Sequence, residues 1–244
     1  MIKFKNVSKS FGSIKALEDV SFEVDKGEFV FLTGPSGAGK TTLLRLLLRE
    51  MKADKGKIEF DDVDITTLPD EYIPQFRQKI GVVFQDFKIL EERTVRENVE
   101  VALAVLGVPE DHWKARVDQV LKLVGLYDRS ELFPRQLSGG EIQRTSIARA
   151  LVVNPKIILA DEPTGNLDWE TADGLLDLME KINKEGKTII MATHNHMVLE
   201  KYKKRNIKIK DGKIVSKEKV SEEKPHSTEE HKEDKMKVEE EKNE

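Results

Sequence analysis

The strongest constraint on the fold is one glycine-rich segment, which reads Gly34-Pro35-Ser36-Gly37-Ala38-Gly39-Lys40-Thr41. It matches the pattern G-x-x-x-x-G-K-[ST], follows the apolar run at residues 29–33 and opens a helical stretch at residues 41–51. In this context the backbone N–H groups and the helix amino terminus face phosphate oxygens. We therefore predict a phosphate-binding loop, in which Lys40 neutralises the outer phosphates of a nucleotide and the Thr41 hydroxyl is a ligand of Mg²⁺. The alternative, a glycine-rich turn with an exposed lysine, leaves the strand before it and the helix after it unexplained.

A second apolar strand ends in two adjacent acidic residues, Asp161 and Glu162. The carboxyl ends of parallel strands lie at one edge of a sheet, so we expect these carboxylates to face the phosphate loop. Adjacent carboxylates allow divided roles: Asp161 would hold Mg²⁺ through its water shell, and Glu162 would polarise the attacking water. An acidic turn after a core strand is the alternative, and the presence of the phosphate loop makes it the weaker one.

Apolar runs and helical segments alternate along the chain, which indicates an α/β fold. The expected strands lie at residues 2–7, 20–24, 29–33, 57–60, 80–84, 157–160 and 188–192. The runs at 80–84, 157–160 and 188–192 are nearly continuously apolar, as is typical of parallel strands buried on both faces. Further helices are expected at residues 110–124 and 168–183. Residues 87–136 contain no convincing buried strand, and we predict an inserted, mostly helical subdomain there.

The carboxyl-terminal part divides the chain into a folded body and a charged tail. Asp211-Gly212 lies between two short alternating runs, which predicts a hairpin at residues 207–215 that closes the body. Residues 216–244 hold seven lysines and eleven acidic residues, so the formal net charge of -4 lies entirely in this segment. Such a segment buries too little apolar surface to order itself. We therefore predict one domain at residues 1–215 and a disordered tail at residues 216–244.

Composition limits the possible partners. The body is neutral and lacks the basic surface that nucleic-acid binding generally requires, so no nucleic-acid partner is expected. The chain has no cysteine, which favours a reducing, intracellular compartment. No run approaches the roughly 18 apolar residues of a membrane-spanning helix, so we expect no direct membrane span and membrane association only through a partner.

Four further motifs follow in order, and together with the two above they resemble the pattern of the ATP-binding cassette (ABC) family. Leu137-Ser138-Gly139-Gly140-Glu141 is similar to the signature motif of that family. Gln85 matches its Q-loop, Gly165-Asn166-Leu167-Asp168 its D-loop, and His194 its switch histidine. Phe11 stands where the family places an aromatic residue that stacks on adenine. The resemblance covers residues 1–215.

The resemblance implies a P-loop NTPase domain with a mostly parallel core sheet, an antiparallel β subdomain and an inserted helical subdomain. It implies ATP hydrolysis with ATP and Mg²⁺ as cofactors, catalysis by Lys40, Glu162 and His194, and metal ligation by Thr41, Gln85 and Asp161. The implied nucleotide contacts are Phe11, Gly34, Pro35, Ser36, Gly37, Ala38, Gly39, Lys40, Thr41, Thr42, Gln85, Ser138, Gly139, Gly140 and Asp168.

The resemblance also implies partners. Two copies would form a homodimer in the ATP-bound state, with Ser138 and the glycines of one copy closing on the γ-phosphate held by the other. Residues 86–90 would contact a polytopic membrane protein, which would place the chain at the cytoplasmic face of the cell membrane. A nucleotide-gated scaffold and the energy subunit of an exporter or lipoprotein-releasing complex are the alternative functions.

Four of these residues have plainer alternatives. Ser138 is a sound helix N-cap, His194 could be an ordinary loop histidine, Gln85 a strand-end amide, and Phe11 a core aromatic.

Overall fold

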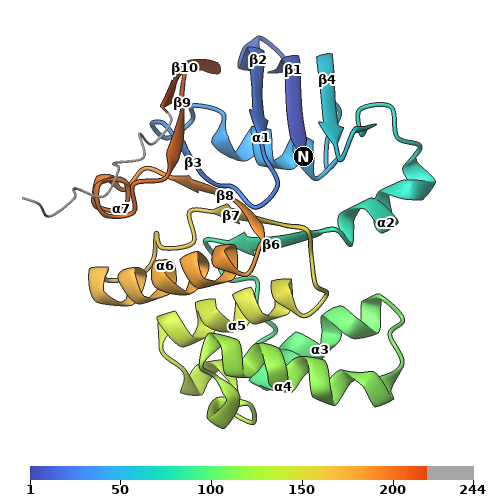
Figure 1. Ribbon diagram of the computed structural model, residues 1–244, viewed down its shortest axis with the longest axis vertical. Helices are drawn as coiled ribbons and strands as arrows, with labels where there is room; N and C mark the ends of the chain where they lie inside the picture. Colours follow the sequence, from blue (N-terminus) through green and yellow to red (C-terminus); the bar gives the residue numbers. More distant parts are fainter. Residues whose placement is uncertain (219–244) are drawn as a thin grey trace, which may run out of the picture.

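The computed structural model describes residues 1–218, which form two β-sheets with helices packed around them (Figure 1). The strand order is β10-β9-β3-β8-β7-β6 in the larger sheet and β2-β1-β4-β5 in the smaller one. The strands of the larger sheet are β3 (Phe29–Thr33), β6 (Ile80–Phe84), β7 (Ile157–Asp161), β8 (Thr188–Thr193), β9 (Arg205–Lys210) and β10 (Lys213–Glu218). Those of the smaller sheet are β1 (Ile2–Phe11), β2 (Ile14–Val24), β4 (Lys55–Phe60) and β5 (Val63–Asp64).

The larger sheet is parallel from β9 to β6, and only β10 pairs antiparallel, with β9. Successive side chains of a strand point to opposite faces of the sheet. In β3, Val30 and Leu32 enter one hydrophobic core, whereas Phe29 and Phe31 enter another. Because both faces of the sheet are covered in this way, its inner strands β3, β7 and β8 and the edge strand β6 are nearly continuous apolar runs.

Helix α1 (Lys40–Leu47) and the smaller sheet cover one face of the larger sheet (Figure 1). Leu43 and Leu47 of α1 are fully buried in the same core as Ile2 and Phe4 of β1. Phe4 stacks on Phe22 of the neighbouring strand, with ring centroids 4.6 Å apart. The helix that follows the phosphate loop is therefore held between the two sheets.

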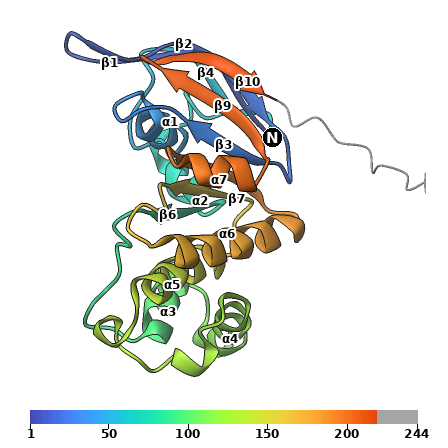
Figure 2. The same ribbon diagram turned by 90° about the vertical axis from the view of Figure 1, so that its left-hand side faces the viewer.

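Helices α5 (Gly139–Leu151) and α6 (Trp169–Lys184) cover the opposite face of the larger sheet. Helices α3 (Val95–Val105) and α4 (Trp113–Val124) pack against α5 and form the far end of the molecule (Figure 2). The remaining helices and turns are η1 (Asp70–Tyr72), α2 (Ile73–Arg77), η2 (Glu110–His112), η3 (Tyr127–Arg129), η4 (Pro134–Gln136) and α7 (His196–Lys201).

The structure confirms the predicted α/β fold with a mostly parallel core sheet. Three boundaries differ for identifiable reasons. Strands β1 and β2 extend beyond the expected residues because they pair with each other almost to the turn, at Phe11 and Ile14. Helix α1 ends at Leu47 rather than near residue 51, because Arg49 has a left-handed backbone with a φ of 55°.

The carboxyl-terminal hairpin is present, with Lys210 paired to Lys213 across the Asp211-Gly212 turn. Strand β10 continues to Glu218, three residues past the expected end of the body. The rest of the expected tail, residues 219–244, lies outside the described residues. Within residues 1–218, no helix combines the length and the apolar character needed to cross a membrane.

Candidate functional site

Four loops meet at the edge of the larger sheet where β3, β6, β7 and β8 end. Because these strands are parallel, their carboxyl ends share one edge. Strand β3 leads into the phosphate loop and β6 into Gln85, β7 ends at Asp161 and is followed by Glu162, and His194 follows β8. The fold thus brings four of the six sequence motifs to one place.

The phosphate loop turns sharply between β3 and α1. Gly34 has a φ of 152°, and a Cβ atom there would lie 2.1 Å from Ile209 O, so only glycine fits. Lys40 is 5% exposed, and its Nζ donates to Gly34 O at 2.8 Å and to Pro35 O at 3.2 Å. Helix α1 begins at Lys40 without a side-chain cap and without an acidic residue in its first turn. Its first N–H groups are therefore suited to an anion.

Glu162 lies between two basic side chains. Its Oε1 is 3.5 Å from Lys40 Nζ, and its Oε2 is 2.7 Å from His194 Nδ1. The Glu162 side chain is 18% exposed and that of His194 is 64% exposed, so this group of three residues is open to water on the histidine side. The Glu162 N–H donates to Ala192 O at 3.0 Å, which ties the end of β7 to β8.

Asp161 and Thr41 lie side by side. Burial raises the pKa of Asp161, and a hydrogen bond from the Thr41 hydroxyl partly opposes this rise. A carboxylate and a hydroxyl are oxygen donors of the kind that Mg²⁺ accepts together with phosphate oxygens. Within residues 1–218, no group of three or more His, Cys, Asp or Glu could hold a metal by itself. The donor set therefore fits an ion shared with bound phosphates better than one enclosed by protein.

Gln85 contacts the loop between β7 and α6. Asn166 Nδ2 donates to Gln85 O at 3.0 Å, and Gln85 Nε2 donates to Asn166 Oδ1 at 3.4 Å. In the same loop Asp168 caps α6, since it accepts from Thr171 N at 3.0 Å and from Thr171 Oγ1 at 2.7 Å. These hydrogen bonds lower the pKa of Asp168. The family resemblance implied that Asp168 contacts the nucleotide, whereas in this structure its carboxylate serves as the helix cap.

Ser138, Gly139 and Gly140 lie at the start of α5, on the face of the sheet opposite to α1. Ser138 is the N-cap in a capping box: its Oγ accepts from Glu141 N at 3.3 Å, and its N–H donates to Glu141 Oε2 at 2.9 Å. Gly140 lies close to α6, where a Cβ atom would come within 2.3 Å of Thr171 Cγ2. Within residues 1–218, no hydrogen bond or ion pair joins Ser138 to the phosphate loop.

Phe11 is 47% exposed at the turn between β1 and β2, so the alternative that it is a core aromatic is wrong. Lys9 Nζ lies 5.7 Å from the centre of its ring. Strand β2 also passes close to the phosphate loop, because a Cβ atom at Gly39 would lie 2.6 Å from Ala16 O. An exposed aromatic ring is thus carried by the hairpin that flanks the loop.

The hairpin of β9 and β10 contacts the phosphate loop and supports it. Gly212 N donates to Ala38 O at 3.2 Å, and Glu18 N of β2 donates to Gly212 O at 2.8 Å. The turn therefore joins the loop to β2. Sequence reasoning predicted the hairpin but not this contact, which depends on β9 lying next to β3 in the sheet.

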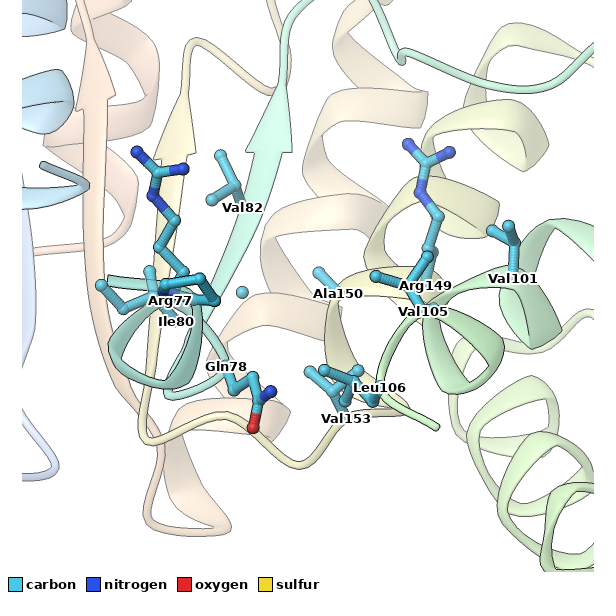
Figure 3. A pocket seen from close by; sticks show the side chains of 13 residues that line it. Arg77, Gln78, Ile80, Val82, Val101, Val105, Leu106, Arg149, Ala150 and Val153 are labelled. Atoms are coloured by element: carbon cyan, nitrogen blue, oxygen red, sulfur yellow. The ribbon is translucent and has the colours of Figure 1, made fainter. Parts of the chain in front are cut away.

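A cavity of about 500 Å³ opens beside the edge strand β6, between α2, α3 and α5 (Figure 3). Val82, Val105 and Val153 contribute apolar side chains, and Figure 3 shows Arg77 and Arg149 on opposite sides of Val82. Val105 is 81% exposed.

Two residues of α5 missed by sequence reasoning hold the Gln85 loop. Gln143 is fully buried, and its Nε2 donates to Phe84 O at 3.2 Å and to Pro163 O at 2.8 Å. Arg149 Nη2 donates to Phe87 O at 3.2 Å. In both cases the donor side chain and the accepting carbonyl group are far apart in the chain. No sequence pattern marks such a pair.

The chain is similar to known proteins over most of its length. The family model described as ABC transporter matches residues 17–165. The cell division ATP-binding protein FtsE of Bacillus subtilis is 49% identical over 219 residues, which cover 89% of this chain and 96% of that protein. FtsE of Escherichia coli K12 is 46% identical over 213 residues, which cover 87% of this chain and 96% of that protein.

Solved structures agree with these matches. The dimeric structure of MJ0796, a bacterial ABC transporter cassette, superposes with a TM-score of 0.80 at 38% identity, covering 91% of this chain and 99% of that one. A dimeric post-hydrolysis state of the same cassette bound to ADP and Pi gives a TM-score of 0.79 at 36% identity, with the same coverage.

Proposed function

The chain belongs to the ABC transporter family and is an ATP-binding ATPase, and from this membership we propose that two copies bind two MgATP between them and act on a membrane partner in cell division. The reaction converts ATP and water to ADP and phosphate.

The placement of Glu162 between Lys40 and His194 carries the proposal. A carboxylate at the mouth of the phosphate loop can accept a proton from the water that attacks the γ-phosphate in line. Lys40 would release the carbonyls of Gly34 and Pro35 and bind the outer phosphates instead, and His194 would contact the γ-phosphate. Contacts of 3.5 and 2.7 Å to Glu162 support these roles because they place all three side chains around one point.

The remaining predicted residues take supporting roles. Thr41, Asp161 and Gln85 would hold Mg²⁺, which neutralises charge on the β- and γ-phosphates when it is bound. The exposed ring of Phe11 would stack on adenine, and residues 34–42 would enclose the phosphates. Asp168 would contribute through the start of α6, which it caps.

Replacement of Glu162 by Gln tests the catalytic assignment. Loss of a general base costs roughly 10²- to 10⁴-fold in turnover, whereas ATP binding should remain because the phosphate loop is unchanged. Steady-state phosphate release and equilibrium binding of a fluorescent ATP analogue measure the two quantities. Glu170→Gln, an exposed acidic residue in the first turn of α6, is the matched control and should behave like the unaltered chain. Near-normal turnover of Glu162→Gln would refute the role.

A second copy is proposed because Ser138 and the phosphate loop lie in different layers of one chain. Helix α1 packs on one face of the larger sheet and α5 on the other. Ser138 and the N–H groups of Gly139 and Gly140 are therefore available to the nucleotide of a partner copy. The dimeric MJ0796 structures support this arrangement by similarity.

The membrane partner is proposed from the relatives, which are named as cell division proteins. We assign an FtsX-like polytopic protein that regulates cell-wall hydrolysis, with this chain held at the cytoplasmic face of the membrane. The cavity beside β6 supports a docking surface here, because Arg149 lines it and also binds Phe87 O, within residues 86–90.

Co-purification from membranes tests the partner. Val105→Glu places a charge in the cavity and should reduce recovery of the membrane protein while ATP binding persists. Val63→Glu, an exposed valine of β5, is the control that should leave recovery unchanged. A multi-spanning protein with one large outer domain supports the division function, whereas a substrate-binding permease would instead favour the exporter. Normal division of cells that carry only Glu162→Gln would favour the nucleotide-gated scaffold.

A further inference from the structure

Asn166 makes two hydrogen bonds with Gln85, and the chemistry of the groups fixes which atom donates and which accepts in each. Its Nδ2 donates to Gln85 O at 3.0 Å, and its Oδ1 accepts from Gln85 Nε2 at 3.4 Å. The backbone carbonyl can only accept, so it determines which end of the Asn166 amide faces it. Oδ1 then has to face the Gln85 side chain, and that side chain has to present Nε2. Within residues 1–218, no hydrogen bond uses Gln85 Oε1.

Gly165 provides the space for this arrangement. A Cβ atom at Gly165 would lie 2.9 Å from Gln85 Nε2 and 3.2 Å from Gln85 Cδ. Real Cβ atoms essentially never come within 3.0 Å of another atom, so any larger residue would push the Gln85 amide out of place. Gly165 and Asn166 therefore act together as a seat for the Gln85 side chain, and we use the name Gln85 seat for these two residues.

Hydrogen bonds from the backbone and from α5 hold the Gln85 seat in place. Gly165 N donates to Glu162 O at 3.0 Å, so the seat is attached directly to the residue after β7. The buried amide of Gln143 donates to Phe84 O and to Pro163 O, which precede Gln85 and the seat in the chain. A single side chain of α5 thus fixes the distance between the two segments.

We propose that Asn166 is a positioning residue that sets the orientation of the Gln85 amide, so that Oε1 is the atom offered to Mg²⁺ or to its water. This inference rests on the proposed role of Gln85 as a metal ligand and adds how the ligand is oriented. A glutamine amide can turn either its oxygen or its nitrogen toward an ion, but only the oxygen can bind the ion. Outer partners of this kind orient metal ligands in proteins, and their loss costs roughly 10- to 100-fold in metal affinity.

The test compares binding of a fluorescent ATP analogue in excess Mg²⁺ with binding in EDTA. The dissociation constant in EDTA divided by that in Mg²⁺ measures the contribution of the metal, and this ratio does not depend on turnover. Gln85→Ala and Asn166→Ala should each lower this ratio, by about 10-fold at the lower end of the range for such partners. Asn166→Asp keeps the shape but cannot donate to Gln85 O, and Gly165→Ala displaces the amide, so both should lower the ratio as well. Binding in EDTA should be unchanged in Asn166→Ala, Asn166→Asp and Gly165→Ala, because neither Asn166 nor Gly165 is among the assigned nucleotide contacts.

Two controls separate orientation from a general loss of stability. Asn154→Ala alters an exposed asparagine before the opposite end of β7, and it should leave the ratio unchanged even if it lowers the melting temperature. The double variant Gln85→Ala/Asn166→Ala should match Gln85→Ala alone, because Asn166 acts only through Gln85.

The possible outcomes are distinct. A lowered ratio for Gln85→Ala with a normal ratio for Asn166→Ala overturns this inference and leaves the metal-ligand assignment standing. Additive losses in the double variant also overturn it. Normal ratios for both single variants overturn the inference together with the assignment of Gln85 to the metal.

Discussion

At the scale of single residues, Glu162 combines a reactive position with an uncommon backbone conformation. Its φ is 49°, in the left-handed region that costs a non-glycine residue roughly 1 kcal/mol. Two hydrogen bonds of 3.0 Å, from Glu162 N to Ala192 O and from Gly165 N to Glu162 O, hold this conformation. The chain turns here immediately after β7, so that the carboxylate reaches Lys40 and His194. The strain is stored at the residue to which we assign the base, as is common at functional sites.

Phe11 yields a prediction about nucleotide affinity. If its exposed ring stacks on adenine, Phe11→Ala should weaken ATP binding by about 1–3 kcal/mol, or roughly 5- to 150-fold in the dissociation constant. Phe11→Tyr keeps a stacking ring and should bind nearly as the unaltered chain does. Titration calorimetry measures both, and inorganic triphosphate, which lacks a base, provides the reference ligand. An equal loss of affinity for triphosphate would contradict stacking.

The motif residues could be predicted because each motif is a short segment with a local backbone requirement. The phosphate loop and the pair Asp161 and Glu162 are of this kind. Asn166, Gln143 and Arg149 could not be predicted to touch the Gln85 loop, since their hydrogen bonds span 81, 59 and 62 residues of sequence. Only the packing of α5 and of the β7–α6 loop against β6 brings these groups together.

At the scale of elements, α5 connects several parts of the site. Ser138 caps its start, Gln143 donates to the end of β6 and to Pro163 O just after β7, and Arg149 donates to Phe87 O. An α-helix of 13 residues is stiff, so a displacement near residues 86–90 should move its start as well. This helix is the physical link between the proposed partner surface and the proposed second nucleotide.

The capping box of α5 yields a prediction about pH. The Ser138 N–H donates to Glu141 Oε2 at 2.9 Å and thereby lowers the pKa of Glu141. A carboxylate with a lowered pKa stabilises the fold above its unfolded pKa, and that stabilisation is lost as the pH falls through its folded pKa. Glu141→Gln should therefore lower the free energy of unfolding by about 0.5–1 kcal/mol near neutral pH and by less in acid.

Urea denaturation across this pH range measures the effect. Glu200→Gln, which changes an exposed glutamate of α7 outside any capping box, serves as the control and should unfold at nearly the same urea concentration as the unaltered chain. If the loss of unfolding free energy in Glu141→Gln stays constant down to acid pH, the charge of Glu141 is irrelevant and only its side-chain geometry matters.

Element identity followed from the sequence more reliably than element ends. Apolar runs of four or five residues marked the core strands because burial on both faces leaves no room for polar residues. The ends of helices and strands depend on tertiary contacts. Arg77, for example, donates to Leu48 O and Arg49 O, so the carbonyl groups at the end of α1 are bound by a residue far along the chain.

At the scale of the whole molecule, the separation of Ser138 from the phosphate loop predicts complementation between inactive chains. Lys40→Ala disables the phosphate loop, and Gly139→Asp places a carboxylate where a partner's γ-phosphate would lie. Each variant alone should form dimers with no intact site. In a mixture, random pairing makes half of the dimers mixed, and each mixed dimer has one intact site of two. The ATPase rate of the mixture should then recover to about a quarter of the normal rate.

The matched control mixes Lys40→Ala with a chain that carries both changes. No intact site can form in that mixture, so its rate should stay at background. Failure of the first mixture to recover, or recovery of the control, would contradict a site shared between two copies.

The hydrogen bond from Gly212 to Ala38 sets a lower limit on the length of any functional fragment. The match to the family model stops at residue 165, and the last motif is His194. A fragment trimmed just after that histidine would retain every motif and yet lose the hairpin that supports the phosphate loop. We expect such a fragment to bind ATP poorly. A chain that ends between residues 194 and 212 would therefore contain every motif and still be unable to hold a nucleotide.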